Sequence, residues 1–226
     1  MTSSTGTTRP RLARAYSGWP GPTQVWDATD IELWRDSFVE AAGRAERAGF
    51  ELVELHAAHG YGLNQWLSPL TNRRQDPFGG VLEGRAALLI AIVRGIREQH
   101  PGLGVAVRMP GQDFLAGGLT VEDGHWLGEK LRGAGACLLD VSSGIGGWRR
   151  PGTRIGEGYL LEESAGIQSR VELPVIGVGG IESGSFIDRA LREKKLSLAA
   201  VGRAILGDPE GWARKWLDPA PSNFMR

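Results

Sequence analysis

Residues 50–55 read FELVEL, a short apolar segment bounded by Gly49 and by polar residues from His56 onward, and this pattern predicts a β-strand. Upstream, apolar side chains recur at helical spacing over residues 31–48. A helix is therefore expected there, beginning at a capping box over residues 29–32 and ending at Gly49 as a left-handed cap. The chain thus pairs a helix with the strand that follows it.

The same alternation continues toward the C-terminus. Short apolar segments predict four further strands, at residues 104–108, 136–141, 174–178 and 197–201. Apolar residues at helical spacing predict helices at residues 82–99, 121–133, 162–171 and 183–193. Strict alternation of helices with strands that are apolar on both faces is typical of a parallel sheet with crossover helices. The predicted fold class is α/β.

Polar and glycine-rich segments follow the carboxyl ends of the predicted strands, and their placement favours a (β/α)8 barrel over an open sheet. They lie at residues 56–61, 108–112, 142–147, 179–180 and 202–203. In such barrels the active site occupies that face, and the loops after the last two strands hold phosphate. An open dinucleotide-binding sheet would need G-x-G-x-x-G after its first strand, where this chain has HAAHG.

The composition excludes several functional classes. The 226 residues are 41% hydrophobic and 23% charged, which predicts one globular domain or at most two small ones. The 26 basic and 26 acidic residues cancel, so no overall positive field favours nucleic acid or an anionic membrane. No apolar run approaches the ~20 residues of a membrane span, and residues 1–10 lack a signal peptide's apolar region. We therefore expect a cytoplasmic protein.

Cys137 is the single cysteine of the chain. One cysteine excludes an intramolecular disulfide and any zinc or iron–sulfur site that needs several thiolates. Because Cys137 lies in the apolar run ACLL, it is predicted to be a small core residue.

Several motifs carry a resemblance to a known family. Residues 52–85 read LVELHAAHGYGLNQWLSPLTNRRQDPFGGVLEGR, and later segments read VAVRM, GGLT, DVSSG, PVIGVGGI and AVGRAILGDP, ending at residue 209. In this order they resemble the C-terminal portion of the old yellow enzyme family of FMN-dependent ene-reductases. The resemblance covers roughly residues 29–217 and implies FMN as cofactor and NAD(P)H as reductant.

The resemblance implies catalytic roles for three residues that follow the first predicted strand. His56 and His59 would bind the carbonyl oxygen of an enone-like substrate, where negative charge accumulates as hydride arrives. Tyr61 would donate the proton as a general acid. From the residues alone, the two histidines are also compatible with structural or metal-binding roles, and Tyr61 with packing at the barrel mouth. No metal site is predicted, because no third ligand lies near the histidines in sequence.

The resemblance also implies which residues bind FMN. Arg108 would lie beside the flavin N1 and C2 carbonyl, where a cation stabilises the reduced ring. Glycine backbones and an arginine after the last two strands would hold the phosphate, as Gly179, Gly180, Gly202 and Arg203. Ser143, with Ser142 before it, either lines the cofactor pocket or caps the strand end.

The number of strands falls short of a complete barrel. A (β/α)8 barrel takes about 250 residues, whereas this chain supplies about five C-terminal strand–helix units and lacks counterparts of the first three strands. We predict that a second polypeptide supplies those strands, or that the chain self-associates, with FMN bound across the junction. The predicted organisation is a flexible or partner-binding arm at 1–28, the barrel portion at 29–217 and a tail at 218–226.

Three functions follow as hypotheses. The first is an FMN-dependent oxidoreductase subunit that acts on an α,β-unsaturated carbonyl compound. The second is a redox-neutral isomerase or cyclase on the same scaffold. The third is a non-catalytic structural subunit, against which the presence of His56, His59, Tyr61 and Arg108 argues.

Overall fold

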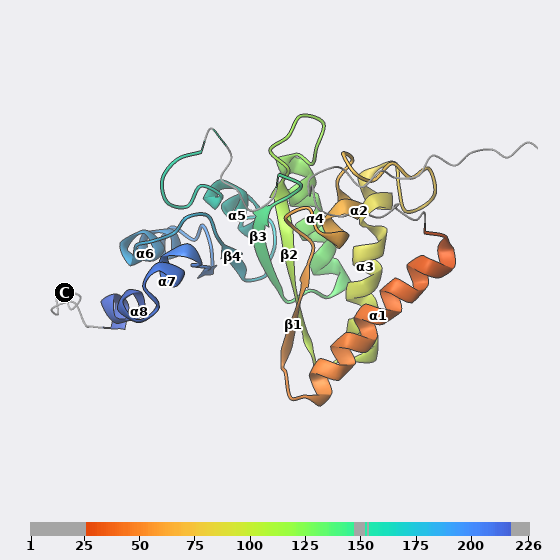
Figure 1. Ribbon diagram of the computed structural model, residues 1–226, viewed down its shortest axis with the longest axis horizontal. Coiled ribbons are helices and arrows are strands. Elements are labelled where there is room, and N and C mark those ends of the chain that lie inside the picture. The colour runs from red at the N-terminus through yellow and green to blue at the C-terminus, as the bar shows by residue number, and fades with distance from the viewer. Residues whose placement is uncertain (1–25, 147–151, 153, 218–226) are drawn as a thin grey trace, which may run out of the picture.

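The computed structural model describes residues 26–146, 152 and 154–217, which form one parallel sheet with helices around it (Figure 1). The sheet has 5 strands in sequence order. They are β1 (Leu52–His56), β2 (Gly104–Gln112), β3 (Leu138–Ser143), β4 (Val175–Gly177) and β5 (Leu198–Ala199). The predicted α/β class and its five strands are therefore confirmed. Residues 1–25 of the predicted arm and the predicted tail at 218–226 lie outside the described residues.

Helices connect the strands and cover one face of the sheet. They are α1 (Ala28–Arg47), α2 (Gly62–Leu67), α3 (Leu82–Gln99), α4 (Val121–Ala134), α5 (Leu161–Gln168), α6 (Gly184–Arg192), α7 (Arg203–Gly207) and α8 (Pro209–Leu217). Because the strands are parallel and sequential, crossovers of one hand place the connecting helices on the same face. Figure 1 shows α1 alongside α3, which it contacts. No helix in the described part of the chain is long and apolar enough to cross a bilayer.

The hydrophobic core lies between the sheet and these helices. Val105, Val107 and Met109 of β2 are fully buried, in one cluster with Leu88 and Ile92 of α3. Side chains on the opposite face of the sheet are less covered: the exposed fractions are 42% for Leu52 on β1 and 49% for Leu198 on β5. In a closed barrel this second face is the packed interior. The described residues therefore leave open the face that a barrel would enclose.

The start of α1 differs from the prediction. Asp27 caps the helix: its carboxylate accepts the Asp30 N–H at 3.0 Å, and the Asp30 carboxylate accepts the Asp27 N–H at 3.1 Å. The capping box predicted at residues 29–32 is wrong, because two aspartates three residues apart form a complete box slightly earlier. At the other end, Gly49 has a φ of +89°, the left-handed conformation expected of a terminating glycine.

Some elements were missed or differ in length. The helices α2, α7 and α8 are absent from the prediction: α2 and α7 have only 6 and 5 residues, too few for a periodic pattern, whereas the 9 residues of α8 do carry one that the prediction missed. Strand β2 continues to Gln112, beyond its predicted end, because Pro110 and Gln112 pair with Ser142 and Ser143 across a register shift.

Cys137 is exposed, which corrects the prediction of a core residue. It lies just before β3, and its thiol faces the Val105 carbonyl oxygen at 3.5 Å. The apolar run around it does not bury it, because its sulfur lies on the less covered face of the sheet, where a Cβ at Gly104 would meet both this sulfur and the Leu52 side chain at 3.3 Å.

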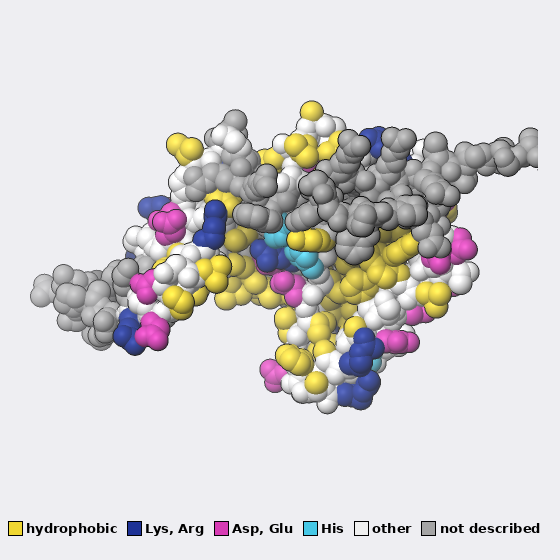
Figure 2. All heavy atoms as spheres, in the orientation of Figure 1, with side chains coloured by type: hydrophobic (Ala, Val, Ile, Leu, Met, Phe, Trp, Pro, Cys, Tyr) yellow, Lys and Arg dark blue, Asp and Glu magenta, His cyan; other side chains and the backbone are white. Residues whose placement is uncertain are grey.

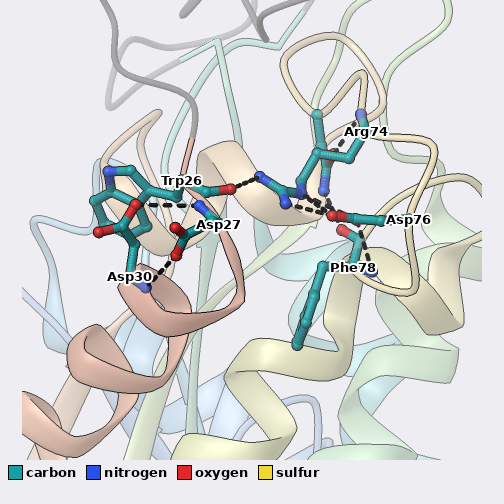
Figure 3. A network of polar contacts seen from close by, with 7 residues as sticks. Trp26, Asp27, Asp30, Arg74, Asp76 and Phe78 are labelled. Carbon is teal, nitrogen blue, oxygen red and sulfur yellow. Dashed lines mark hydrogen bonds and ion pairs between the residues drawn. The ribbon is translucent and has the colours of Figure 1, made fainter. Parts of the chain in front are cut away.

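The segment between α2 and α3 is anchored to the start of α1 (Figure 3). Arg74 donates a hydrogen bond to the Trp26 carbonyl at 3.0 Å and forms an ion pair with Asp76. Asn72 donates to the Phe78 carbonyl at 2.8 Å. These contacts fix the path of a long loop at the carboxyl edge of the sheet and thereby the position of α2.

Candidate active site

The residues predicted for the site lie at or near the carboxyl edge of the sheet, either within a strand or in the loop after it. The catalytic candidates His56, His59 and Tyr61 lie at the end of β1 and just beyond it; the cofactor candidates are Arg108 on β2, Ser143 on β3, Gly179 and Gly180 after β4, and Gly202 and Arg203 after β5. The structure brings these residues to one edge of the sheet, which is where a (β/α)8 barrel places its active site. Their roles in binding and catalysis remain predictions.

The aromatic rings of the three catalytic candidates, His56, His59 and Tyr61, lie close together. The His56 ring centroid lies 5.1 Å from that of His59 and 5.4 Å from that of Tyr61. His59 is 9% exposed, whereas Tyr61 is 46% exposed. Two imidazoles and a phenol therefore surround one small region, with the histidines deeper than the tyrosine. Among the described residues, no group of three or more His, Cys, Asp or Glu is arranged to hold a metal ion.

The backbone holds the loop of His59 in place. His59 has a φ of +60°, uncommon for a non-glycine residue, and its N–H donates to the Ser143 carbonyl at 3.1 Å. The next amide, of Gly60, donates to the buried side-chain oxygen of Asn64 on α2 at 2.7 Å. The histidine loop is thus fixed to both β3 and α2.

Charged side chains lie level with His56 on the open face of the sheet. His56, Arg108 and Asp140 are in register on neighbouring strands, so their side chains project to the same side. The Arg108 Nε lies 3.2 Å from Asp140 Oδ2. Figure 2 shows histidine side chains near the centre of this face, next to basic and acidic side chains. The site therefore combines imidazoles with one arginine and a buried carboxylate.

Burial and the nearby cation keep the histidines neutral near pH 7. Burial lowers the pKa of His59 to about 4, and the charge of Arg108, with that of His56 once its ring is protonated at low pH, adds to that shift. The pKa of His56 is also lowered, first by burial and then by Arg108. A neutral imidazole carries one N–H, so each ring can donate one hydrogen bond.

Burial raises the pKa values of the two nearby carboxyl groups, Asp140 and Glu54, instead of lowering them. Burial raises the pKa of Asp140 to about 6, because the loss of hydration outweighs the attraction of Arg108. The pKa of Glu54, one layer lower on β1, is raised by burial and lowered to a lesser degree by Arg108. The two carboxylates therefore face the same guanidinium group.

A hollow of about 250 Å³ lies beside this cluster. Its lining includes most of the predicted cofactor residues together with His59: Arg108, Ser143, Gly180, Gly202 and Arg203. Binding pockets for whole ligands are usually 300–1,000 Å³, so the hollow corresponds to part of a cofactor site.

The residues present fit FMN. Gly179 and Gly180 have φ values of +131° and +63°, and a Cβ at Gly179 would lie 2.8 Å from the Leu160 nitrogen. Gly179 therefore lets this loop pack closely against the backbone of Leu160, whereas Gly180 lines the hollow, where its backbone can approach an anion. Arg203 lies beside it and hydrogen-bonds to the Tyr159 hydroxyl at 3.2 Å. Arg108 offers a second cation, whose buried Nε makes no hydrogen bond within the described residues.

Sequence reasoning assigned no role to three residues of this edge. Asp140 was visible as a charged residue inside an apolar strand, which is a signal of a functional site. Tyr159 lines the hollow, and its only signal was an aromatic residue in a glycine-rich loop. Asp113 is fully buried and accepts hydrogen bonds from Ser68, Leu119 and Ile145, contacts that no local pattern reveals.

Comparison with known proteins identifies the family. The model of the NADH:flavin oxidoreductase / NADH oxidase family matches residues 20–217. An NADH oxidase of Thermoanaerobacter brockii is 37% identical over 204 residues, which cover 82% of this chain and 29% of that protein. An NADPH dehydrogenase of Geobacillus thermodenitrificans is 37% identical over 190 residues, covering 84% of this chain and 55% of that protein.

A solved structure supports the same relationship. Morphinone reductase in complex with tetrahydroNAD superposes with a TM-score of 0.68 at 28% identity, and the match covers 88% of this chain and 53% of that one. The chain spans about half the length, or less, of these relatives, and its fold is a partial (β/α)8 barrel. The predicted FMN cofactor and NAD(P)H reductant agree with the family. The chain belongs to the NADH:flavin oxidoreductase / NADH oxidase family.

Proposed function

We propose that this chain is the C-terminal half of an FMN-dependent ene-reductase. In the reaction, a hydride that comes from NAD(P)H is added to the β-carbon of an α,β-unsaturated carbonyl compound, and a proton is added to its α-carbon. The observation that carries the proposal is the cluster of His56, His59 and Tyr61, with ring centroids 5.1 and 5.4 Å from His56.

The histidines suit the binding of a carbonyl oxygen that gains charge. When hydride adds to the β-carbon, the electron pair of the double bond moves toward this oxygen and forms an enolate. Two N–H donors aimed at the oxygen stabilise that charge. Because burial lowers the pKa values of both histidines, they act as neutral hydrogen-bond donors and do not transfer their protons.

Tyr61 suits proton donation to the α-carbon. Its phenol is more exposed than the histidines and borders the same small region, at the start of α2. After the proton leaves, solvent can reprotonate the exposed phenol. A general acid of this kind contributes typically 10²- to 10⁴-fold to the rate.

The predicted cofactor residues would hold FMN at both ends. FMN, when bound, supplies the hydride transfer. Arg108 would place its charge against the pyrimidine edge of the ring, and Ser143 lies on the neighbouring strand. Gly179, Gly180, Gly202 and Arg203 would bind the phosphate through backbone amides and a guanidinium group.

We further propose that a second polypeptide supplies the remaining barrel strands. Leu52 and Leu198, on the two edge strands, are 42% and 49% exposed on the face that a barrel encloses, and Phe50 beside β1 is 63% exposed. Edge strands with exposed apolar side chains favour pairing with further strands. The chain also covers only 53% of morphinone reductase. The proposed partner therefore carries strands that pair with β1 and β5.

Anaerobic flavin spectroscopy tests the activity. The chain, isolated together with any protein that binds it, is expected to show an FMN spectrum that NADPH or NADH bleaches and that cyclohexenone restores. A spectrum that the reductant never bleaches would favour a redox-neutral isomerase or cyclase.

Mass measurement tests the partner. A heteromer with a second barrel segment is the expected result, and a homo-oligomer would show self-association instead. A stable monomer that binds FMN stoichiometrically would contradict the split barrel.

A further inference from the structure

The hydrogen bond between His59 and Ser142 determines which ring nitrogen of His59 can meet a ligand. The Nε2 of His59 lies 2.6 Å from the Oγ of Ser142. The two residues are 9% and 3% exposed and line the same hollow. Since Nε2 is engaged by Ser142, Nδ1 is the nitrogen left to contact a substrate oxygen.

The direction of this hydrogen bond has chemical consequences. A neutral imidazole has one N–H and one bare nitrogen, and the partner of one nitrogen fixes the state of the other. If His59 donates from Nε2 to Ser142, then Nδ1 is bare and repels an enolate oxygen. If the Ser142 hydroxyl donates to Nε2, then Nδ1 carries the proton and can stabilise that oxygen.

We propose that Ser142 is a positioning residue that donates its hydroxyl proton to Nε2 of His59 and holds the ring in the Nδ1–H form. The inference rests on the proposed function of His59 as a donor to the substrate oxygen. It adds that a serine on β3 prepares the histidine for this task before substrate binds.

The backbone supports such a fixed pair. Ser142 is held in β3, in register with Pro110 of β2. The N–H of His59 donates to the carbonyl of Ser143, the next residue of the same strand. Ring and hydroxyl are therefore positioned by one strand, and the short hydrogen bond needs no rearrangement to form.

Nuclear magnetic resonance of the ring nitrogens tests the proposal without flavin or substrate. The full chain is labelled with ¹⁵N-histidine, and long-range ¹H–¹⁵N spectra near neutral pH report which nitrogen carries the proton. The variant His59→Gln assigns the signals. Ser142→Ala removes the hydroxyl and Ser142→Thr retains it.

Ser164→Ala is the matched control, because Ser164 is fully buried and its hydroxyl donates to the Leu160 carbonyl at 3.1 Å. We expect the Nδ1–H form in the original chain, in Ser142→Thr and in Ser164→Ala, and a shift toward the Nε2–H form in Ser142→Ala. An Nε2–H form in the original chain would overturn the proposal, as would an unchanged ratio in Ser142→Ala.

Turnover provides a second readout. In the FMN-loaded complex, Ser142→Ala is expected to lower kcat roughly tenfold with little change in FMN affinity, since one hydrogen bond to the oxygen is lost. An inactive complex with the predicted Nδ1–H form would contradict the proposed function but not the tautomer. An active complex in the Nε2–H form would contradict this inference alone.

Discussion

The Nε of Arg108 lies 3.2 Å from the Oδ2 of Asp140, and the two residues face each other from neighbouring strands on the open side of the sheet. The pairing leaves polar atoms unused, because the buried Arg108 Nε and Asp140 Oδ1 make no hydrogen bond within the described ranges. Buried polar atoms without partners destabilise a protein unless a ligand satisfies them. Arg108 and Asp140 are therefore suited to hydrogen-bond with the polar edge of a ligand.

Asp140 is expected to make stability fall as the pH rises. Burial raises its pKa to about 6, so between pH 4 and 6 the unfolded chain loses a proton that the folded chain retains. The contribution of Asp140 to the free energy of unfolding should decrease across this window by up to about 3 kcal/mol. Asp140→Asn should remove that contribution, so its free energy of unfolding should rise more with pH than that of the original chain, whereas Asp188→Asn, at an exposed ion pair, should match the original chain. Urea unfolding at several pH values measures both, and equal pH slopes for Asp140→Asn and the original chain would refute the expectation.

His59 is expected to make the protein more stable as the pH rises. Its pKa is lowered to about 4, so between pH 4 and 6.5 the unfolded chain binds a proton that the folded chain excludes. The contribution of His59 to stability should therefore rise with pH over this window. His59→Gln should remove that contribution and lower the pH slope relative to the original chain in the same urea experiment, and His100→Gln, in the partly exposed pair with Glu46, serves as control. An equal pH slope in His59→Gln and in the original chain would argue against a buried neutral imidazole.

The fold was predictable because apolar periodicity is a local property. The helix expected at 82–99 has the bounds of α3, and the strand expected at 50–55 overlaps β1. For the site, the motifs predicted which residues take part but not which of them contact each other. The contacts that set its chemistry join residues far apart in sequence, such as His59 and Ser142, and depend on strand register. Short helices such as α2 depend on tertiary packing and leave little periodic pattern.

Asp113 is expected to be a major determinant of stability at the carboxyl edge. Its carboxylate accepts hydrogen bonds from the Ser68 hydroxyl at 2.6 Å and from the Leu119 and Ile145 amides at 2.8 Å each. These partners lie in the loops after β1, β2 and β3. Asp113→Ala should lower the free energy of unfolding by about 3–5 kcal/mol, because two buried donors and one half-buried donor lose their acceptor.

Chemical denaturation measures this loss, with Asp188→Ala as the exposed comparison. A loss for Asp113→Ala no larger than that of the comparison would show that the three loops do not depend on this carboxylate.

Gly179 and Gly133 provide a matched pair of glycine substitutions. At Gly179 the φ is +131° and a Cβ would lie only 2.8 Å from the Leu160 nitrogen, so Gly179→Ala should destabilise the fold by about 1–3 kcal/mol and weaken FMN binding. At Gly133 of α4 a Cβ meets nothing within 4 Å, so Gly133→Ala should stabilise by about 0.5–1 kcal/mol. Thermal unfolding and FMN fluorescence titration distinguish the two, and equal effects would contradict the proposed phosphate loop.

The anaerobic reaction of the isolated complex with NAD(P)H and then cyclohexenone tests the central claim most directly, with His56→Ala/His59→Ala as comparison. We predict that the reductant bleaches bound FMN in both proteins, that the enone restores the oxidised spectrum rapidly in the original complex, and that restoration slows at least a hundredfold in the double variant. Equal rates of restoration in the two complexes would contradict the assignment of the histidines, and failure of the enone to restore the original complex would contradict the ene-reductase function itself.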